Sequence, residues 1–295
     1  MRGYKITFLI ILSFCINLNS TTTATFLKFP NDARIISAGC IYDTQTDNFG
    51  TVLINPAINL SYNQNHIRYT NHIRYTRSVL FDDISYNNFL YFKGMSNGTI
   101  GFIMNYNDNG VMEGRDISGN KISDFGSKNK LVGLNYSQSI GNNTFGINLK
   151  YISLNIADEK ADTFAFDLGY KSYIGNKIGF GISVENIGRK VKFIDEKENL
   201  PSYIHFGLTY NISGFLLSIN TNKMIYTNEK SIIFSMEYPL FDSLYLRGGY
   251  NALDFDNKSS FNMGLGIKLR NFNLDYGIIS RNYTKLQSMT LGVRF

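Results

Sequence analysis

The chain has 295 residues and a formal net charge of +6, and it contains 20 Tyr, 23 Phe and 26 Gly but only 4 Pro and no Trp. This composition favours strands and turns over helices, and the length is sufficient for one large β domain. The positive charge is too mild to indicate a nucleic-acid-binding protein.

The first 24 residues have the organisation of a secretory signal peptide. Arg2 and Lys5 supply a positive region, residues 6–18 are mostly apolar, and Ala24 ends a small-residue cleavage site. The apolar run is too short to cross a bilayer as a helix, which takes about 20 residues. A lipoprotein signal at Cys15 is the alternative, but the bulky residue directly before this cysteine fits a lipoprotein cleavage site poorly.

Residues 25–57 lack strand periodicity and are predicted to form an N-terminal plug in the lumen of a barrel made by residues 58–295. A 14-stranded barrel is too wide for strand side chains alone to fill, so water or a folded segment must occupy it. We expect Arg34 and the turn Asn55-Pro56-Ala57 to anchor this segment to the barrel wall.

Residues 65–70, Asn-His-Ile-Arg-Tyr-Thr, are repeated at once as residues 71–76. Because six is an even number, the duplication preserves the two faces of a strand, and we interpret it as a lengthening of the first hairpin. The alternative is a metal site built on His66 and His72, for which no third ligand lies nearby in the sequence.

The rest of the chain contains about fourteen segments in which apolar and polar residues alternate. Side chains on a strand alternate with a period of two, and a tilted membrane strand needs about 9 to 11 residues. We therefore predict an all-β fold, a 14-stranded antiparallel transmembrane β-barrel. The strands are expected near residues 58–68, 86–95, 98–107, 129–138, 143–153, 162–173, 177–187, 203–212, 214–222, 231–238, 243–252, 260–269, 271–280 and 287–295.

A soluble β-sandwich also alternates but buries its apolar face, whereas a membrane barrel turns that face to lipid. Tyr residues close the apolar stripe of many segments, which is typical of an aromatic girdle, and the opposite faces carry Gly and charges of both signs. These features favour a barrel with a mostly polar lumen, apart from Ile103, Ile233 and Ile279. The candidate lumen residues are Asp167, Lys171, Glu185, Glu237, Arg247, Lys268, Asp275 and Arg294.

Connections between the predicted strands alternate in length, as short periplasmic turns and longer outer loops do. An even strand count then places both chain ends on the periplasmic side. The last segment ends on Phe295, as bacterial outer-membrane barrels usually end, so we expect the barrel-assembly machinery to recognise it. The long connections are predicted at 69–85, 108–128, 154–161, 188–202, 223–230, 253–259 and 281–286.

No catalytic motif is present after the signal peptide, so we expect no enzymatic activity and no cofactor or metal. The lumen carboxylates are interpreted as parts of a solvated ionic network rather than as acid–base catalysts. The connection at 108–128, rich in Gly, Asn and Asp, is interpreted as a solvated surface loop rather than a cation site.

The phrase "FLKFPNDARIISAGCIYDTQTDNFGTVLINPA", residues 26–57, resembles the mature N-terminus of the PorV/PorQ family, distant relatives of the FadL long-chain fatty acid transporters. The chain departs from the family pattern at Cys40 and at Ile58-Asn59. The resemblance implies a 14-stranded barrel with a lumenal plug in the bacterial outer membrane. The family positions kept in this segment are Phe26-Leu27, Ala33-Arg34, Gly39, Tyr42, Asp47 and Asn55-Pro56-Ala57.

The resemblance implies that outer-membrane lipid surrounds the barrel and that one of two activities is present. One is passage of a hydrophobic small molecule, as in FadL; the other is a role with secreted proteins in the outer-membrane step of type IX secretion. A structural scaffold without transport is the remaining alternative. A mostly polar lumen weakens a fatty-acid route, although Phe26, Leu27, Phe29 and Ile36 are available to line an apolar pocket.

Overall fold

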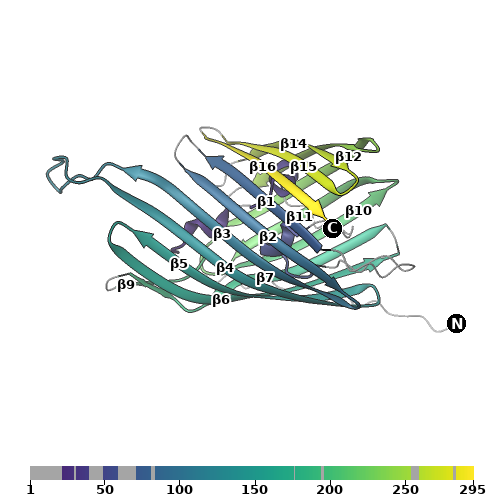
Figure 1. Ribbon diagram of the computed structural model, residues 1–295, viewed down its shortest axis with the longest axis horizontal. Helices are drawn as coiled ribbons and strands as arrows, with labels where there is room; N and C mark the ends of the chain where they lie inside the picture. The colour runs from purple at the N-terminus through teal and green to yellow at the C-terminus, as the bar shows by residue number, and fades with distance from the viewer. Residues whose placement is uncertain are drawn as a thin grey trace.

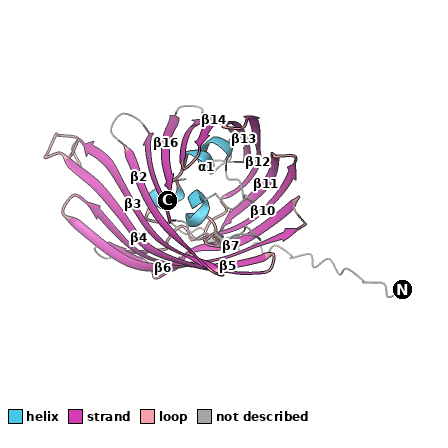
Figure 2. Ribbon diagram, turned by 45° about the vertical axis from the view of Figure 1, so that its right-hand side comes forward, coloured by secondary structure: helices cyan, strands magenta, loops and turns pink. Residues whose placement is uncertain are grey.

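The computed structural model describes residues 22–29, 31–39, 49–58, 71–80, 84–175, 177–193, 196–253, 259–281 and 284–295. Fourteen of the described strands form a closed antiparallel barrel, in which β1 pairs with β16 to complete the ring (Figures 1 and 2). Two short strands, β8 and β9, form a separate hairpin. The predicted 14-stranded barrel is confirmed, while residues 1–21 of the predicted signal peptide lie outside the described residues.

Most barrel strands coincide with a predicted alternating segment to within a few residues. Their bounds are β1 Asn71–Leu80, β2 Ser85–Met95, β3 Gly98–Met112, β4 Phe125–Ile140, β5 Asn143–Ile156, β6 Glu159–Ile174, β7 Ile178–Gly188, β10 Tyr203–Ile212, β11 Phe215–Met224, β12 Lys230–Phe241, β13 Leu244–Leu253, β14 Ser260–Leu269, β15 Phe272–Arg281 and β16 Thr284–Arg294. The separate hairpin consists of β8 Val191–Phe193 and β9 Glu196–Glu198.

The first strand differs from the prediction. The strand expected at 58–68 falls mainly on residues 59–70, which lie outside the described residues. The first described strand, β1, begins with the second copy of the repeated hexapeptide and occupies much of the expected connection 69–85. Because the two copies have the same alternation, periodicity could not show which copy pairs with β2 and β16.

The strands turn their apolar faces outward and their polar faces into the lumen. Phe166 and Phe206, predicted to face lipid, are 37% and 46% exposed, whereas Asp167 is fully buried behind the same wall. Exposed tyrosines lie toward both ends of the barrel, Tyr136 toward one end and Tyr151 toward the other. This distribution excludes a sandwich core for the apolar stripes, because a sandwich would bury them.

One end of the barrel, here called the turn end, carries the short connections and both the start of β1 and Phe295. At the opposite loop end, the connections after β5 and β15 are two of those that are shorter than predicted. The β5–β6 ladder continues to Ile156 and Glu159, and the β15–β16 ladder continues to Arg281 and Thr284. In the β5–β6 extension the inward positions carry Leu154 and Ala161 and the outward positions Asn155 and Lys160, which reverses the outward-apolar pattern used to identify the strands.

Strands β3 to β6 have 15, 16, 14 and 16 residues, compared with 10 to 12 for the other barrel strands. They reach farther than the rest of the wall on one side of the molecule (Figure 1). The β3–β4 connection that remains, 113–124, lies at the tip of this extension.

The described part of residues 25–57 lies inside the barrel (Figure 2). It contains the 3-10 helices η1 Thr25–Lys28 and η2 Phe49–Leu53 and the α-helix α1 Ala33–Ala38, which packs against β12 to β16. Asp32 caps α1, and Gly39 ends it with φ 70°, a conformation that glycine adopts without strain. None of the helices in the described residues is long and apolar enough to cross a membrane.

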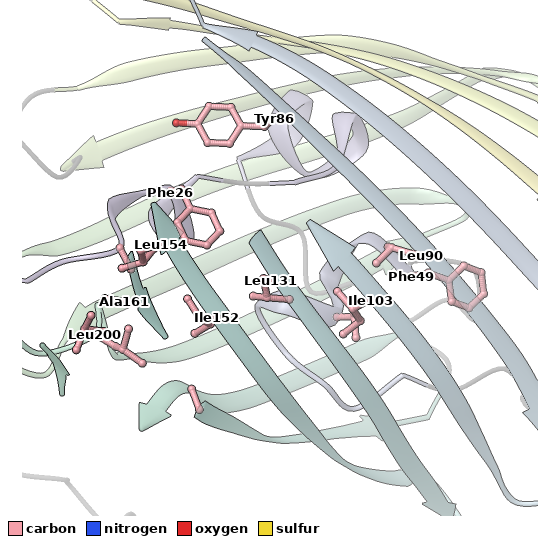
Figure 3. Packing of buried hydrophobic residues seen from close by; sticks show 14 of the residues in the cluster. Phe26, Phe49, Tyr86, Leu90, Ile103, Leu131, Ile152, Leu154, Ala161 and Leu200 are labelled. Carbon is pink, nitrogen blue, oxygen red and sulfur yellow. The ribbon is translucent and has the colours of Figure 1, made fainter. Parts of the chain in front are cut away.

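An apolar core fills the space between this N-terminal segment and the inner wall of β2 to β6 (Figure 3). The segment contributes Phe26 and Phe49, and the wall contributes side chains from every one of these five strands. The lumen is therefore more apolar on this side than predicted. The fully buried wall residues beyond Ile103 include Leu90, Phe92, Leu131 and Ile152. In the sequence, these inward residues are neighbours of outward residues that are also apolar. The alternation between apolar and polar residues is therefore lost at these positions, and it could not indicate an apolar inner patch.

Candidate functional site

Helix α1 is joined to the barrel wall by buried ion pairs. Arg34 donates from Nε and Nη2 to the two carboxylate oxygens of Glu237 on β12, at 2.9 and 2.8 Å. Glu237 also accepts from Arg247 on β13, and Arg247 Nη1 donates to Asp275 on β15 at 2.7 Å. The four side chains, all named from the sequence as candidates, thus form one alternating chain of charges.

A second connection starts from the cap of α1. The Asp32 carboxylate accepts from the amide of Arg34 at 2.9 Å through Oδ1. Its Oδ2 accepts from Arg74 on β1, from Nε at 2.9 Å and Nη2 at 2.6 Å. Arg74 Nη2 also lies 3.2 Å from Asp275 Oδ2, which links the cap to the first chain of charges.

The complete network contains three arginines and three carboxylates, so its formal charges balance. Such balance matters because a buried charge without a partner is strongly destabilising. Sequence reasoning missed Arg74, since it placed this residue in a connection. The duplicated hexapeptide, in which Arg74 occupies an inward-facing strand position, was the available signal.

The turn Asn55-Pro56-Ala57 contacts the opposite side of the barrel. Asn55 Nδ2 donates to the carbonyl oxygen of Tyr170 at 3.2 Å, and Asn135 Nδ2 donates to Pro56 O at 3.0 Å. The turn lies directly on Gly146 of β5 and Gly169 of β6, where a Cβ atom would overlap Pro56 O and Asn55 Oδ1. Glycine is required there because the backbone of the segment approaches the wall so closely.

The other predicted lumen residues are distributed around the wall. Asp167 forms a buried ion pair with Lys150 at 2.5 Å, and Lys171 is buried on the same strand. Glu185 Oε1 lies 2.9 Å from His205 Nε2, on the neighbouring strand. Lys268 and Arg294 are not buried.

Two cavities lie on opposite sides of α1. The first, here called the turn-end cavity, has a volume of about 60 Å³ and is lined by ionic residues that include Arg34, Arg247, Lys268 and Arg294. The second, the loop-end cavity, has a volume of about 80 Å³. By the space one water needs, each has room for several water molecules.

The loop-end cavity combines two kinds of lining. Its apolar part comes mostly from the N-terminal segment and its polar part from the wall of β7 and β10 to β14. The apolar side chains are Leu27, Phe29, Leu53, Ile54, Ile233 and Ile279. The polar side chains include Glu185, His205, Asn222, Ser231, Asn251 and Asn262.

In the part of the chain that the structure describes, neither His72 nor the β3–β4 connection has the ligand geometry of a metal site. His72 packs against Phe49, with ring centroids 4.3 Å apart, and His66 lies outside the described residues. Within the described ranges, no three His, Cys, Asp or Glu residues are grouped to hold a metal ion. In the β3–β4 connection, hydrogen bonds from the Asn120 side chain and backbone hold the pKa of the exposed Asp116 below its ordinary value.

No family model and no curated protein matches the chain. Among solved structures, the toluene transporter TodX of Pseudomonas putida superposes with a TM-score of 0.60 at 12% identity, covering 94% of this chain and 97% of TodX. The toluene transporter TbuX of Ralstonia pickettii gives 0.63 at 10% identity, covering 89% and 97%. The monoaromatic hydrocarbon channel CymD gives 0.62 at 9% identity, covering 93% and 98%. At these identities the likeness establishes a shared fold.

Proposed function

We propose that this protein is a bacterial outer-membrane channel for small hydrophobic molecules, closed in the present conformation by its N-terminal segment. The observation that carries the proposal is a closed barrel, apolar outside, whose lumen contains a folded segment with a cavity on each side. The fold shared with transporters and channels for toluene and other monoaromatic hydrocarbons supports this type of cargo.

The exterior supports the membrane location. In a bilayer every backbone polar group needs a partner within the protein, and a closed barrel provides these partners because it has no free edge. In this arrangement the turn end faces the periplasm, and Phe295 is presented there to the barrel-assembly machinery. Residues 1–24 act as the signal peptide, 25–57 as the plug and 58–295 as the membrane barrel.

Passage requires α1 to move. The two cavities have room for only a few waters each, and α1 with its ionic network lies between them. Hydrophobic molecules enter from the loop end, where apolar side chains of the segment line the cavity. The ionic contacts of Asp32 and Arg34 then set the free energy of opening, because these contacts hold the helix to the wall.

Uptake by intact cells tests the cargo. A Gram-negative host that lacks an uptake channel of its own should take up radiolabelled toluene faster when it carries this protein in its outer membrane. Deleting residues 25–57 should raise the conductance of the purified barrel in planar bilayers. Unchanged uptake would refute transport, and unchanged conductance would refute the plug.

A second candidate is the PorV/PorQ type of role in secretion. Its support is the resemblance of residues 26–57, together with the projecting β3–β6 wall, which offers a surface beyond the barrel rim (Figure 1). A deletion strain should be examined by surface proteomics and lipid uptake together. Loss of surface-anchored proteins alone would favour secretion, and loss of uptake alone would favour transport.

A further inference from the structure

We infer that the loop-end cavity selects a small amphipathic molecule whose polar end donates hydrogen bonds, such as an alcohol or a phenol. This inference rests on the proposed function and narrows its cargo. Both a plain hydrocarbon and a carboxylate should bind less well. The chemistry of the cavity wall carries the argument, starting from its hydrogen-bond acceptors.

Besides His205 Nε2, which lies beside Glu185, three polar groups that line the cavity are buried without a hydrogen-bond partner among the described residues. They are Ser231 Oγ on β12, Asn251 Oδ1 on β13 and Asn262 Oδ1 on β14. These residues are 3%, 6% and 4% exposed. Buried polar atoms are almost always hydrogen-bonded, so a group of unpaired ones around one cavity indicates a ligand that would pair with them.

The orientation of the Asn262 amide follows from its other hydrogen bond. Asn262 Nδ2 donates to the carbonyl oxygen of Ile36 at 2.8 Å, and a carbonyl can only accept, so Oδ1 must point elsewhere. Asn251 Nδ2 lies 2.9 Å from Ser260 Oγ, but a serine hydroxyl can donate or accept, so only the Asn262 amide is oriented by its partner. Asn262 therefore offers an acceptor, and a ligand that pairs with it must supply a donor.

Gly39 lies beside these two amides at the edge of the cavity. It lines the cavity at the end of α1, and a Cβ built there would lie 3.1 Å from Asn251 Oδ1 and 3.3 Å from Asn262 Nδ2. The amides of two adjacent strands thus meet the end of the N-terminal segment at one point. A polar group of the ligand at this point would contact both wall and segment.

The other residues of the cavity wall disfavour the two competing ligand classes, carboxylates and plain hydrocarbons. Glu185 adds carboxylate oxygens to the acceptors and already pairs with His205 at 2.9 Å, so this pair leaves no unengaged cation for an anionic ligand. Lys28, a lining cation, is paired with Glu229 at 3.0 Å. The apolar side chains Leu27, Phe29 and Leu53 cover the opposite side, where the hydrocarbon body of an amphipathic ligand would lie. A hydrocarbon without a donor would fill the cavity but leave the buried acceptors unpaired.

Binding of three matched probes, benzyl alcohol, toluene and benzoate, to the full mature barrel in detergent tests the inference. Probe partition into protein-free micelles is subtracted. The wild type should bind benzyl alcohol more tightly than toluene and benzoate. Replacing Asn262→Leu should weaken benzyl alcohol about tenfold, the effect of one lost hydrogen bond, and leave toluene unchanged. Asn251→Leu should act in the same direction.

Asn88 offers a matched control. Its Nδ2 donates to the carbonyl oxygen of Asn31 at 2.9 Å and its Oδ1 is also buried and unpaired, but Asn88 does not line the cavity. Asn88→Leu therefore removes an equivalent contact with the N-terminal segment and should leave all three probes unchanged. An equal loss in both variants would overturn the inference, because the effect would then be structural.

Two further outcomes separate this inference from the proposed function. If cells carrying the wild-type protein take up toluene and benzyl alcohol equally, and Asn262→Leu changes neither, the donor preference is wrong while the channel stands. If none of the probes binds and uptake matches that of cells without the protein, both proposals fail. Tighter binding of benzoate than of benzyl alcohol would also overturn the donor preference.

Discussion

Arg74 is the most sensitive point of the contact between α1 and the barrel wall. Its guanidinium donates to Asp32 Oδ2 from two nitrogens, at 2.9 and 2.6 Å, and reaches Asp275 Oδ2 at 3.2 Å. The side chain is 5% exposed, and its two partners are no more exposed than that. Replacing Arg74→Leu keeps a side chain of similar bulk on β1 but leaves Asp32 without its guanidinium.

The size of the effect follows from the charge left behind. Removing one partner of a buried ion pair costs about 3–5 kcal/mol, because the remaining charge stays desolvated. Asp275 retains Arg247, so most of this cost falls on Asp32 and is relieved when the N-terminal segment leaves the wall. We therefore expect the ratio of docked to undocked α1 to fall by roughly two to three and a half orders of magnitude, since 1.4 kcal/mol is a factor of ten.

Hydrogen exchange of the α1 amides and single-channel conductance report this change directly. The Arg74→Leu variant should exchange the α1 amides faster and open more often. The double variant Asp32→Asn with Arg74→Leu should recover part of the protection, because the unpaired charge is gone. The control is Arg77→Leu, an exposed arginine on the same strand, which should behave as the wild type. Wild-type exchange in Arg74→Leu would refute the idea that this ion pair holds the helix.

Three other predictions follow from separate contacts. Gly169→Ala should undock the Asn55 turn, because the new Cβ overlaps Asn55 Oδ1; faster proteolysis after residue 50 would show it, and wild-type resistance would contradict the assigned close approach. Phe206→Lys should lower the folding stability in lipid vesicles by about 2–4 kcal/mol, measured by denaturant titration, if its exposed ring faces the middle of the bilayer; an unchanged midpoint would mean that this ring does not face lipid. Because hydrogen bonds lower the pKa of Asp116, its contribution to loop order should be present above its ordinary value of 3.8 and be lost as the pH falls through its lower folded pKa. An NMR titration of the Ser118 and Asn120 amides checks this, and titration of the carboxyl at or above 3.8 would contradict it.

The barrel and the direction of its faces could be predicted from the sequence, because alternation with a period of two is a local property. Phe166 and Asp167 are adjacent in the chain and point to opposite sides of the wall, as their residue types require. The strand count followed from the same pattern. The limits of this local information are visible at β1, where two identical hexapeptides match the pattern equally well, and at the β5–β6 extension, where the apolar residues Leu154 and Ala161 face inward.

The candidate charges were identifiable as inward-facing residues, but their partners were not. Arg34 and Glu237 are 203 positions apart, and Arg74 and Asp275 are 201 positions apart, so only closure of the barrel brings them together. The unpaired oxygens of Asn251 and Asn262 likewise acquire meaning only once α1 and Gly39 lie beside them. Residue order determined which way each side chain faces, whereas the closed ring and the segment folded within it decided which side chains meet, because those contacts join positions far apart in the chain.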